Sequence, residues 1–232
     1  VNVLSDTISE NANVLIYGDY DVDGCTSVSL VYGFLKNLTS NIQYYIPDRF
    51  AEGYGVSQKG IDFAIENKVQ LFITLDCGIT ATDQIKRLRA NNIQVIVCDH
   101  HLPEKVLPNA IILNPKQDDC SYPFKELCGV GVGFKLLQGF CEQQSIEFSQ
   151  LSVHLDLVAL GTSADMVSMT GENRILTSHG LKMMNDNPSA GIKALLSLTG
   201  KTEVKNVSDV VFSLAPRINA CGRIGKATQA VE

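Results

Sequence analysis

The stretch Val95-Ile96-Val97-Cys98-Asp99-His100-His101 is an apolar run that ends on one carboxylate and two adjacent imidazoles. A short run rich in β-branched residues predicts a buried strand, and the polar trio falls where that strand reaches the surface. Parallel α/β sheets place their chemistry at this edge. Two of the four histidines lie here, so the trio is a candidate metal site. The ordinary alternative for this stretch alone is a capped loop with a solvated imidazole.

The first half of the chain alternates apolar strands with amphipathic helices. Runs typical of strands occur at residues 13–18, 42–46, 71–75 and 93–98, and the segments between them carry apolar residues at three- and four-residue spacing. Such alternation predicts right-handed βαβ units. Thr80 and Asp83 resemble a capping box that opens the helix after the strand at residues 71–75. We therefore predict an α/β fold with a mostly parallel sheet flanked by helices, in a Rossmann-like arrangement.

Beyond Pro108 the alternation fades and helical patterns dominate. A further short strand fits residues 111–113, and a polar stretch at residues 118–123 marks a boundary. We expect an α/β part over residues 1–120 and a mainly helical part over residues 121–232. The helices predicted for the second part are residues 133–144, 151–164, 172–185, 191–198 and 207–214.

Composition limits the class of protein. No run approaches the roughly 20 apolar residues of a membrane helix, and no leader-like segment opens the chain. The seven cysteines include no C-x-x-C pair, which argues against a zinc knuckle and favours reduced core cysteines. We expect a soluble protein of the cytoplasm. A start at Val1 rather than Met, and an end inside a helical pattern, indicate a piece of a longer protein.

Acidic side chains follow the predicted strands. Asp19, Asp21 and Asp23 come after the first strand, Asp76 ends another, and residues 99–101 end a third. All these strand ends share one edge of a parallel sheet. Carboxylates crowded there would repel one another, so cations between them are the simplest explanation. Oxygen and imidazole ligands suit Mn²⁺, Mg²⁺ or Fe²⁺.

Net charge allows this interpretation. The formal charge of −6 argues by itself against a broad nucleic-acid-binding face. Six of the acids lie in the clusters and in the motif that contains Asp165, however, and the remainder is neutral. Because bound cations reverse the local sign, a phosphate-bearing substrate is not excluded, but its attraction must be local.

The acids lie in four stretches that resemble the motifs of the DHH phosphoesterase superfamily, in a form similar to the RecJ-type single-strand-specific exonucleases. These are residues 16–24 (IYGDYDVDG), 74–78 (TLDCG), 97–101 (VCDHH) and 159–167 (ALGTSADMV). Residues 49–55 (RFAEGYG) and 216–223 (PRINACGR) resemble two further RecJ signatures. The resemblance runs from Asn13 to the last residue. It places three DHH motifs in residues 1–120 and the fourth in residues 121–232.

The resemblance implies a role for each acidic or imidazole group. Two divalent metal ions would be bound, and Asp76 would bridge them. Mn²⁺ is the first choice for these ions and Mg²⁺ the second. Asp99 would orient an imidazole, as carboxylates commonly do beside metal-bound histidines, and His101 would face the scissile phosphate, which makes Asp76, His101 and Asp99 the catalytic set. Whether Asp19 binds metal or only supports the site stays open. The implied metal ligands are Asp21, Asp23, Asp76, His100 and Asp165.

Three arginines are candidates for phosphate contact. Arg49, Arg217 and Arg223 lie in the two additional signatures, and a guanidinium forms bidentate bonds with phosphate. The resemblance implies that they bind the 5′ phosphate and nearby backbone, with surface ion pairs as the alternative. Tyr20 and Tyr54 fit either stacking on bases or packing in the core.

A glycine-rich segment at residues 129–133 (GVGVG) looks at first like a phosphate loop. Position 134 is Phe where the G-x-G-x-x-G pattern requires glycine, and no clear strand precedes the segment. Close helix packing is therefore the predicted role of these glycines.

The resemblance implies a 5′-to-3′ exonuclease that degrades single-stranded DNA to mononucleotides in DNA repair and recombination. Single-strand-binding proteins and helicases are candidate partners. One alternative is a DHH enzyme acting on short oligonucleotides, cyclic dinucleotides or pyrophosphate. An alternative of another class is a non-catalytic DNA-binding scaffold with a RecJ-like fold.

We predict weak, salt-sensitive nuclease activity for this chain by itself, because the resembled family continues into a second subdomain beyond the point where the sequence stops. An acidic chain without that subdomain should hold DNA poorly, mainly through a few phosphate contacts that salt screens. Digestion of long single strands at rising salt, compared with a longer chain, measures this. Equal processivity of the two would contradict the prediction.

Overall fold

Five parallel strands form a single sheet in the computed structural model, which describes residues 1–224 and 227–231, with only the backbone of residues 223, 224 and 227. The strand order is β2-β1-β3-β4-β5. The prediction of an α/β fold is confirmed, and the sheet is wholly parallel. The strands are β1 (Val14–Gly18), β2 (Ile42–Tyr45), β3 (Leu71–Leu75), β4 (Gln94–Cys98) and β5 (Ile111–Leu113).

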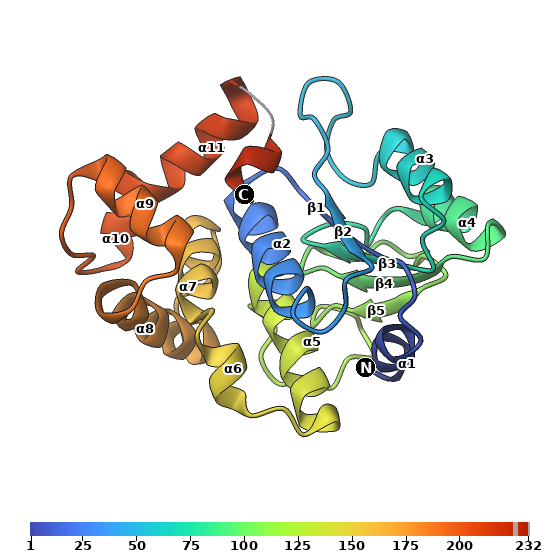
Figure 1. Ribbon diagram of the computed structural model, residues 1–232, viewed down its shortest axis with the longest axis horizontal. Coiled ribbons are helices and arrows are strands. Elements are labelled where there is room, and N and C mark those ends of the chain that lie inside the picture. The colour runs from blue at the N-terminus through green and yellow to red at the C-terminus, as the bar shows by residue number, and fades with distance from the viewer. Residues whose placement is uncertain (225–226, 232) are drawn as a thin grey trace.

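Helices cover both faces of the sheet (Figure 1). On one face lie α3 (Gln58–Glu66) and α4 (Thr82–Ala90), which pack over Leu15 and Tyr17 of β1. On the other face lie α2 (Val22–Leu35) and α5 (Gly129–Gln144), with α1 (Asn2–Ser9) beside α5. Because both faces are covered, β1 and β3 are apolar at nearly every position rather than alternating.

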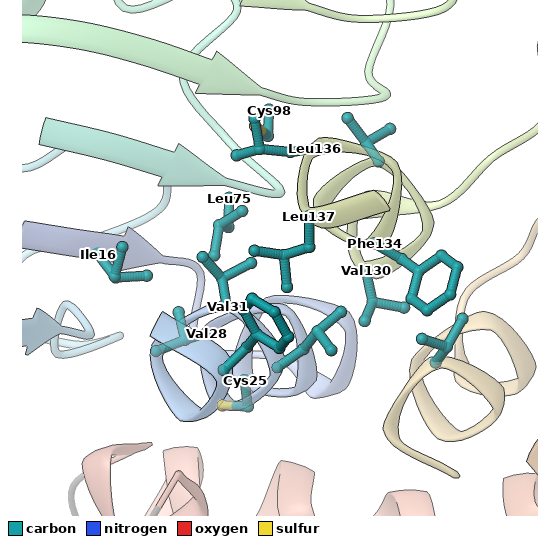
Figure 2. Close-up of a cluster of buried hydrophobic side chains, with 14 of the residues drawn as sticks. Ile16, Cys25, Val28, Val31, Leu75, Cys98, Val130, Phe134, Leu136 and Leu137 are labelled. Carbon is teal, nitrogen blue, oxygen red and sulfur yellow. The ribbon is translucent and has the colours of Figure 1, made fainter. Parts of the chain in front are cut away.

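The larger core lies between the sheet and the helices α2 and α5. Figure 2 shows Ile16, Leu75 and Cys98, from three neighbouring strands, on the side of the sheet that faces these helices. Val31 of α2 and Leu137 of α5 fill the space opposite them. The same core continues into the helices that follow in the chain, so the two predicted parts share one interior.

The rest of the chain is helical, as the sequence predicts. Here α7 packs on both α2 and α8, and so joins the helical layer to the sheet. The elements are α6 (Phe148–Ser152), α7 (Leu155–Ala164), α8 (Gly171–Asp186), α9 (Ala190–Thr199), α10 (Val207–Asp209), a π-helical turn (Val210–Leu214), α11 (Ala215–Ile224) and a 3₁₀ turn (Ala227–Ala230).

Three predicted boundaries are wrong. Helix α5 begins at Gly129 rather than residue 133, and the helix predicted over residues 151–164 is divided between α6 and α7. The capping box expected at Thr80 is absent, since Ala81 occupies the N-cap without a side-chain hydrogen bond. The preceding loop is fixed instead by a tertiary contact, because the amide of Ile79 donates to Asp99.

Strand order creates a crevice at the carboxyl edge of the sheet. From β1 the chain crosses to β2 on one side, and then returns to β3 on the other side of β1. The loops after β1 and β3 therefore separate, and α/β proteins bind ligands at such a switch point. This position brings the acidic loop after β1 next to Asp76.

Two expectations from composition bear on the fold. All seven cysteines are free thiols and five of them are buried, as expected for core residues. Among the described helices, none combines the length and apolar character that a bilayer-spanning helix requires.

The contact between α7 and α8 predicts a stability difference between two glycine substitutions. A Cβ atom at Gly180 would lie 2.1 Å from the carbonyl oxygen of Leu155, so Gly180→Ala should destabilise the protein by about 1–3 kcal/mol through overpacking. The matched control is Gly33→Ala in α2, where a Cβ meets nothing within 4 Å. That variant should be neutral or more stable by about 0.5–1 kcal/mol. Denaturant unfolding measures both, and equal stability of the two variants would contradict the packing argument.

Candidate metal centre

The loop after β1 carries the first three carboxylates. Asp19 is buried, and its Oδ1 has no hydrogen-bond partner among the described residues. Asp21 is the N-cap of α2 and accepts a hydrogen bond of 2.9 Å from the amide of Gly24. A Cβ atom at Gly24 would lie 2.4 Å from the carbonyl oxygen of Asp19. Glycine is therefore required for the loop to close back on itself and bring the acids together.

Asp23 lies in the first turn of α2 and is held from another helix. Its Oδ2 accepts a hydrogen bond of 2.6 Å from the amide of Gly129, and its Oδ1 accepts one of 2.8 Å from the amide of Val130. These amides begin α5, in the glycine-rich segment whose predicted role was helix packing alone. The sequence offered only the glycines as a signal for this contact.

Asp76 follows β3 in a left-handed backbone conformation, with φ of 59°. For a residue other than glycine this conformation costs on the order of 1 kcal/mol or more, and such positions concentrate at functional sites. The carboxylate is buried, and its Oδ1 lies 3.2 Å from Nε2 of His100. The backbone of the loop thus turns Asp76 back toward the end of β4.

His100 lies among three carboxylates. Besides Asp76, its Nε2 lies 3.9 Å from Oδ2 of Asp23 and 3.6 Å from Oδ2 of Asp165. Asp165 is the C-cap of α7, and its Oδ1 accepts a hydrogen bond from the amide of Met166. Its Oδ2 has no hydrogen-bond partner in the described part of the chain. Four of the five predicted metal ligands therefore meet at His100, and the fifth, Asp21, lies beside Asp76.

Asp99 has a different environment from the other acids. Its Oδ1 accepts hydrogen bonds from the amides of His100 and His101 and lies 2.7 Å from Nδ1 of His101, while Oδ2 accepts from the amide of Ile79. Both carboxylate oxygens of Asp99 are therefore occupied by protein donors. The His101 side chain is 45% exposed and borders the crevice.

Tyr54 and Arg49 lie at the rim. The hydroxyl of Tyr54 is 3.2 Å from Nε2 of His101, although Tyr54 as a whole is 59% exposed. Tyr54 is therefore not a core residue, and its contact with His101 was not foreseen. The guanidinium of Arg49 lies over the ring of Tyr20, with 5.2 Å between its carbon and the ring centroid.

The other two arginines predicted to bind phosphate both lie in α11. Arg217 lies in α11, where its guanidinium donates to the carbonyl oxygen of Ser213 on the preceding turn. It makes no ion pair with the acids of the crevice in the parts of the chain that are described. Arg223 belongs to the backbone of α11, but its side chain lies outside the described residues.

Burial and crowding favour the protonated form of three carboxyl groups. Burial, followed by the charge of Asp21, raises the pKa of Asp19 to about 7. Burial and the charges of Asp165 and Asp21 raise the pKa of Asp23 to about 8. The pKa of Asp76 is well above its usual value because of burial and the charge of Asp23. A cation beside these groups would lower each pKa and favour the ionised form.

The Asp99–His101 pair and His100 behave differently. Burial raises the pKa of Asp99, but the hydrogen bond and charge of His101 outweigh it, and the pKa is lowered overall. The same hydrogen bond raises the pKa of His101. Burial lowers the pKa of His100. The lowered pKa favours the neutral imidazole of His100, which is the form that binds metals.

The donor atoms fit divalent cations. Three sets of side chains each bring their ligand atoms within 4.8 Å of one another: Asp19, Asp21 and Asp76; Asp23, His100 and Asp165; and Asp76, His100 and His101. Asp76 belongs to two of the sets. Asp19 and Asp165 both belong to these sets, and each has one carboxylate oxygen, Oδ1 and Oδ2 respectively, without a hydrogen-bond partner among the described residues. Buried polar atoms are normally satisfied, so their lack of partners agrees with a site built for cations.

A doubly wound sheet with acidic and imidazole groups at its switch point defines an α/β protein with a candidate metal centre. The chain belongs to the DHH family: residues 13–162 match the DHH family, N-terminal domain. The match includes every predicted metal ligand except Asp165.

Similarity to individual proteins extends over nearly the whole chain. The single-stranded-DNA-specific exonuclease RecJ of Bacillus subtilis is 41% identical over 98% of this chain, and that of Escherichia coli is 40% identical over 97%. A crystal structure of exonuclease RecJ bound to manganese superimposes with a TM-score of 0.90 and 33% identity, covering 99% of this chain. This chain spans 28% and 41% of the length of the two relatives and 58% of the chain in that structure.

The raised pKa values predict how pH and metal act on stability. Above the ordinary carboxyl value of 3.8, the folded protein keeps protons that the unfolded chain has lost, up to a pKa of about 7 for Asp19 and about 8 for Asp23. The pKa of Asp76 is raised in the same direction. Metal-free stability should therefore fall as the pH rises through this window. A bound cation replaces those protons, so Mn²⁺ should raise Tm more at pH 8 than at pH 5.5.

Thermal unfolding with EDTA or with Mn²⁺ at both pH values measures this. Asp76→Asn is the matched variant, since asparagine also tolerates the left-handed conformation. It should be more stable than the parent at pH 8 without metal, and should gain less from Mn²⁺. A metal-free Tm that rises between pH 5.5 and 8 would be incompatible with the crowded carboxylates described here.

Proposed function

We propose that this chain carries the metal centre of a phosphodiesterase that degrades single-stranded DNA from the 5′ end and releases mononucleotides. The observation that carries the proposal is the convergence of Asp21, Asp23, Asp76, His100 and Asp165 on one crevice. Similarity to RecJ exonucleases over nearly the whole chain supports the choice of substrate.

The three ligand sets support two cation positions. In this proposal Asp19 joins Asp21 and Asp76 at an all-oxygen position, and Asp23, His100 and Asp165 form a second position that includes an imidazole. Asp76 lies next to both and is the proposed bridge. Mn²⁺ is the first choice, because it accepts both oxygen and imidazole ligands and because the similar RecJ structure contains manganese. Mg²⁺ is the second choice.

Held by these residues, two divalent cations would supply a nucleophile at neutral pH and charge stabilisation for the phosphate and the departing oxygen. The side chains around them bind and orient. Asp99 holds the ring of His101 through Nδ1. In the protonated imidazolium, which the raised pKa of His101 favours, Nε2 can donate to a phosphate oxygen in place of its contact with Tyr54.

The proposed DNA path begins at Arg49. This exposed guanidinium lies over Tyr20 at the rim, near enough for its charge to lower the pKa of Asp19. Arg217 and Arg223 are retained as proposed backbone contacts. Neither the arrangement of Arg217 on its own helix nor the backbone position of Arg223 tests that role.

Broader proposals follow from the substrate. We propose a role in DNA repair and recombination, with single-strand-binding proteins or helicases as partners. A cytoplasmic location agrees with seven free cysteines, which persist in reducing compartments. The division into a part over residues 1–120 and a part over residues 121–232 stays a proposal about function: the first part carries most ligands and the second contributes Asp165.

An end-labelled digestion tests the activity. With Mn²⁺, single strands labelled at the 5′ end should release labelled mononucleotide first, 3′-labelled strands should shorten progressively, and duplex should resist. Asp76→Asn should lose at least about 100-fold in rate, since a bridging ligand affects both cations. The matched control is Asp119→Asn, which removes an exposed carboxylate outside the crevice and should retain the parent rate.

The alternatives give different results in the same assay. Faster hydrolysis of dinucleotides, cyclic dinucleotides or pyrophosphate than of long strands would identify a DHH enzyme of another substrate class. DNA binding without cleavage would identify a scaffold. Equal rates for the parent and Asp76→Asn would rule out the proposed mechanism.

A further inference from the structure

The first turn of α5 touches both deeply buried carboxylates of the metal centre. The amides of Gly129 and Val130 donate to the two oxygens of Asp23, over 2.6 Å and 2.8 Å. On its other side, Gly129 packs directly against Asp76. A Cβ atom at position 129 would lie 2.5 Å from Cβ of Asp76 and 2.7 Å from its Oδ1.

These two amides are available because of where they lie in the helix. The first four amides of an α-helix have no partner within the helix, and its N-terminus carries partial positive charge. No lysine or arginine pairs with Asp23 among the described residues. The start of α5 is therefore the main local compensation for this buried carboxylate.

The two hydrogen bonds fix the orientation of the Asp23 carboxylate but use only some of its lone pairs. Each carboxylate oxygen has two lone pairs, and each amide uses one of them. The remaining lone pairs stay available to a cation. Repulsion from Asp76 and Asp165 would otherwise favour rotation of the Asp23 side chain away from the crevice, and the two amides oppose that rotation.

Two helices approach the two carboxylates so closely that only glycine fits at the points of contact. Besides Gly129, Gly161 of α7 approaches Asp23 so closely that a Cβ would lie 3.0 Å from its Oδ1. Gly131, one helical step beyond Val130, differs. A Cβ there would meet only side-chain atoms, the nearest being Cδ2 of Leu127 at 3.2 Å. The requirement for glycine at position 129 is thus specific to the metal centre.

We propose that Gly129 and Val130 are positioning residues of the metal centre. Their amides set the orientation of Asp23, and the missing side chain of Gly129 leaves the carboxylate of Asp76 in its place beside His100. This inference rests on the proposed function, which assigns Asp23 and Asp76 as metal ligands. It predicts that changes at the start of α5 weaken cation binding although neither residue binds a cation.

Mn²⁺ binding to the whole chain tests the proposal, with the free ion measured by electron paramagnetic resonance. Gly129→Ala displaces Asp76, and Val130→Pro removes one amide donor at a helix position that tolerates proline. Each should weaken Mn²⁺ binding about 10–100-fold, the usual effect of losing a group that orients a ligand. Gly131→Ala, the matched control on the same helix, should bind as the parent does. The metal-free Tm of each variant reports its fold.

The outcomes separate this inference from the function on which it rests. Parent-like Mn²⁺ binding by either Gly129→Ala or Val130→Pro would overturn the positioning role. Failure of the parent itself to bind Mn²⁺ would overturn the proposed function instead.

If a variant fails to fold, NMR spectra of the backbone amides of the ¹⁵N-labelled parent and of Asp23→Asn test the two hydrogen bonds directly. The resonances of Gly129 and Val130 should lie downfield in the parent and shift in Asp23→Asn. Resonances that stay unchanged would overturn the proposal without any reference to metal.

Discussion

The candidate metal centre at the carboxyl edge of the sheet depends on one constraint, the burial of neighbouring carboxylates that repel one another. Asp23 and Asp76 are both nearly inaccessible to solvent, and both lie close to Nε2 of one imidazole. Burial and mutual repulsion raise their pKa values, which destabilises the folded protein at neutral pH unless a cation compensates. Stability and metal binding are therefore coupled by the same few side chains.

The fold brings these carboxylates together and also supplies the helices that hold them in place. Parallel strands place the loops after β1, β3 and β4 at one edge, and the strand order opens a crevice between two of them. Helices α5 and α7 then approach this edge from the helical layer. The glycine at the start of α5 lets its backbone amide reach Asp23, and Asp165 at the end of α7 lies beside His100.

The prediction from sequence succeeded where the physical cause is local. The strands β1, β3 and β4 are apolar runs because helices cover both faces of the sheet, and each run ends on the residues that form the site. Predicted helix boundaries failed where a tertiary contact decides them. Near Thr80, for example, the loop is fixed by the bond from Ile79 to Asp99, and a local capping box does not form.

The sequence by itself determined the α/β class, the parallel sheet and the acidic and imidazole groups at the strand ends, because these follow from hydrophobic pattern and residue type. Asp165 was identified only through the resemblance to the DHH motifs. Only the tertiary structure decided how those groups meet. It brought Asp165, from the end of α7, to 3.6 Å from His100, and it placed the hydroxyl of Tyr54 on His101. It also recruited the amides of Gly129 and Val130. Every residue except proline carries the same backbone amide, so its direction depends on where a helix begins and what lies opposite, which no local pattern encodes.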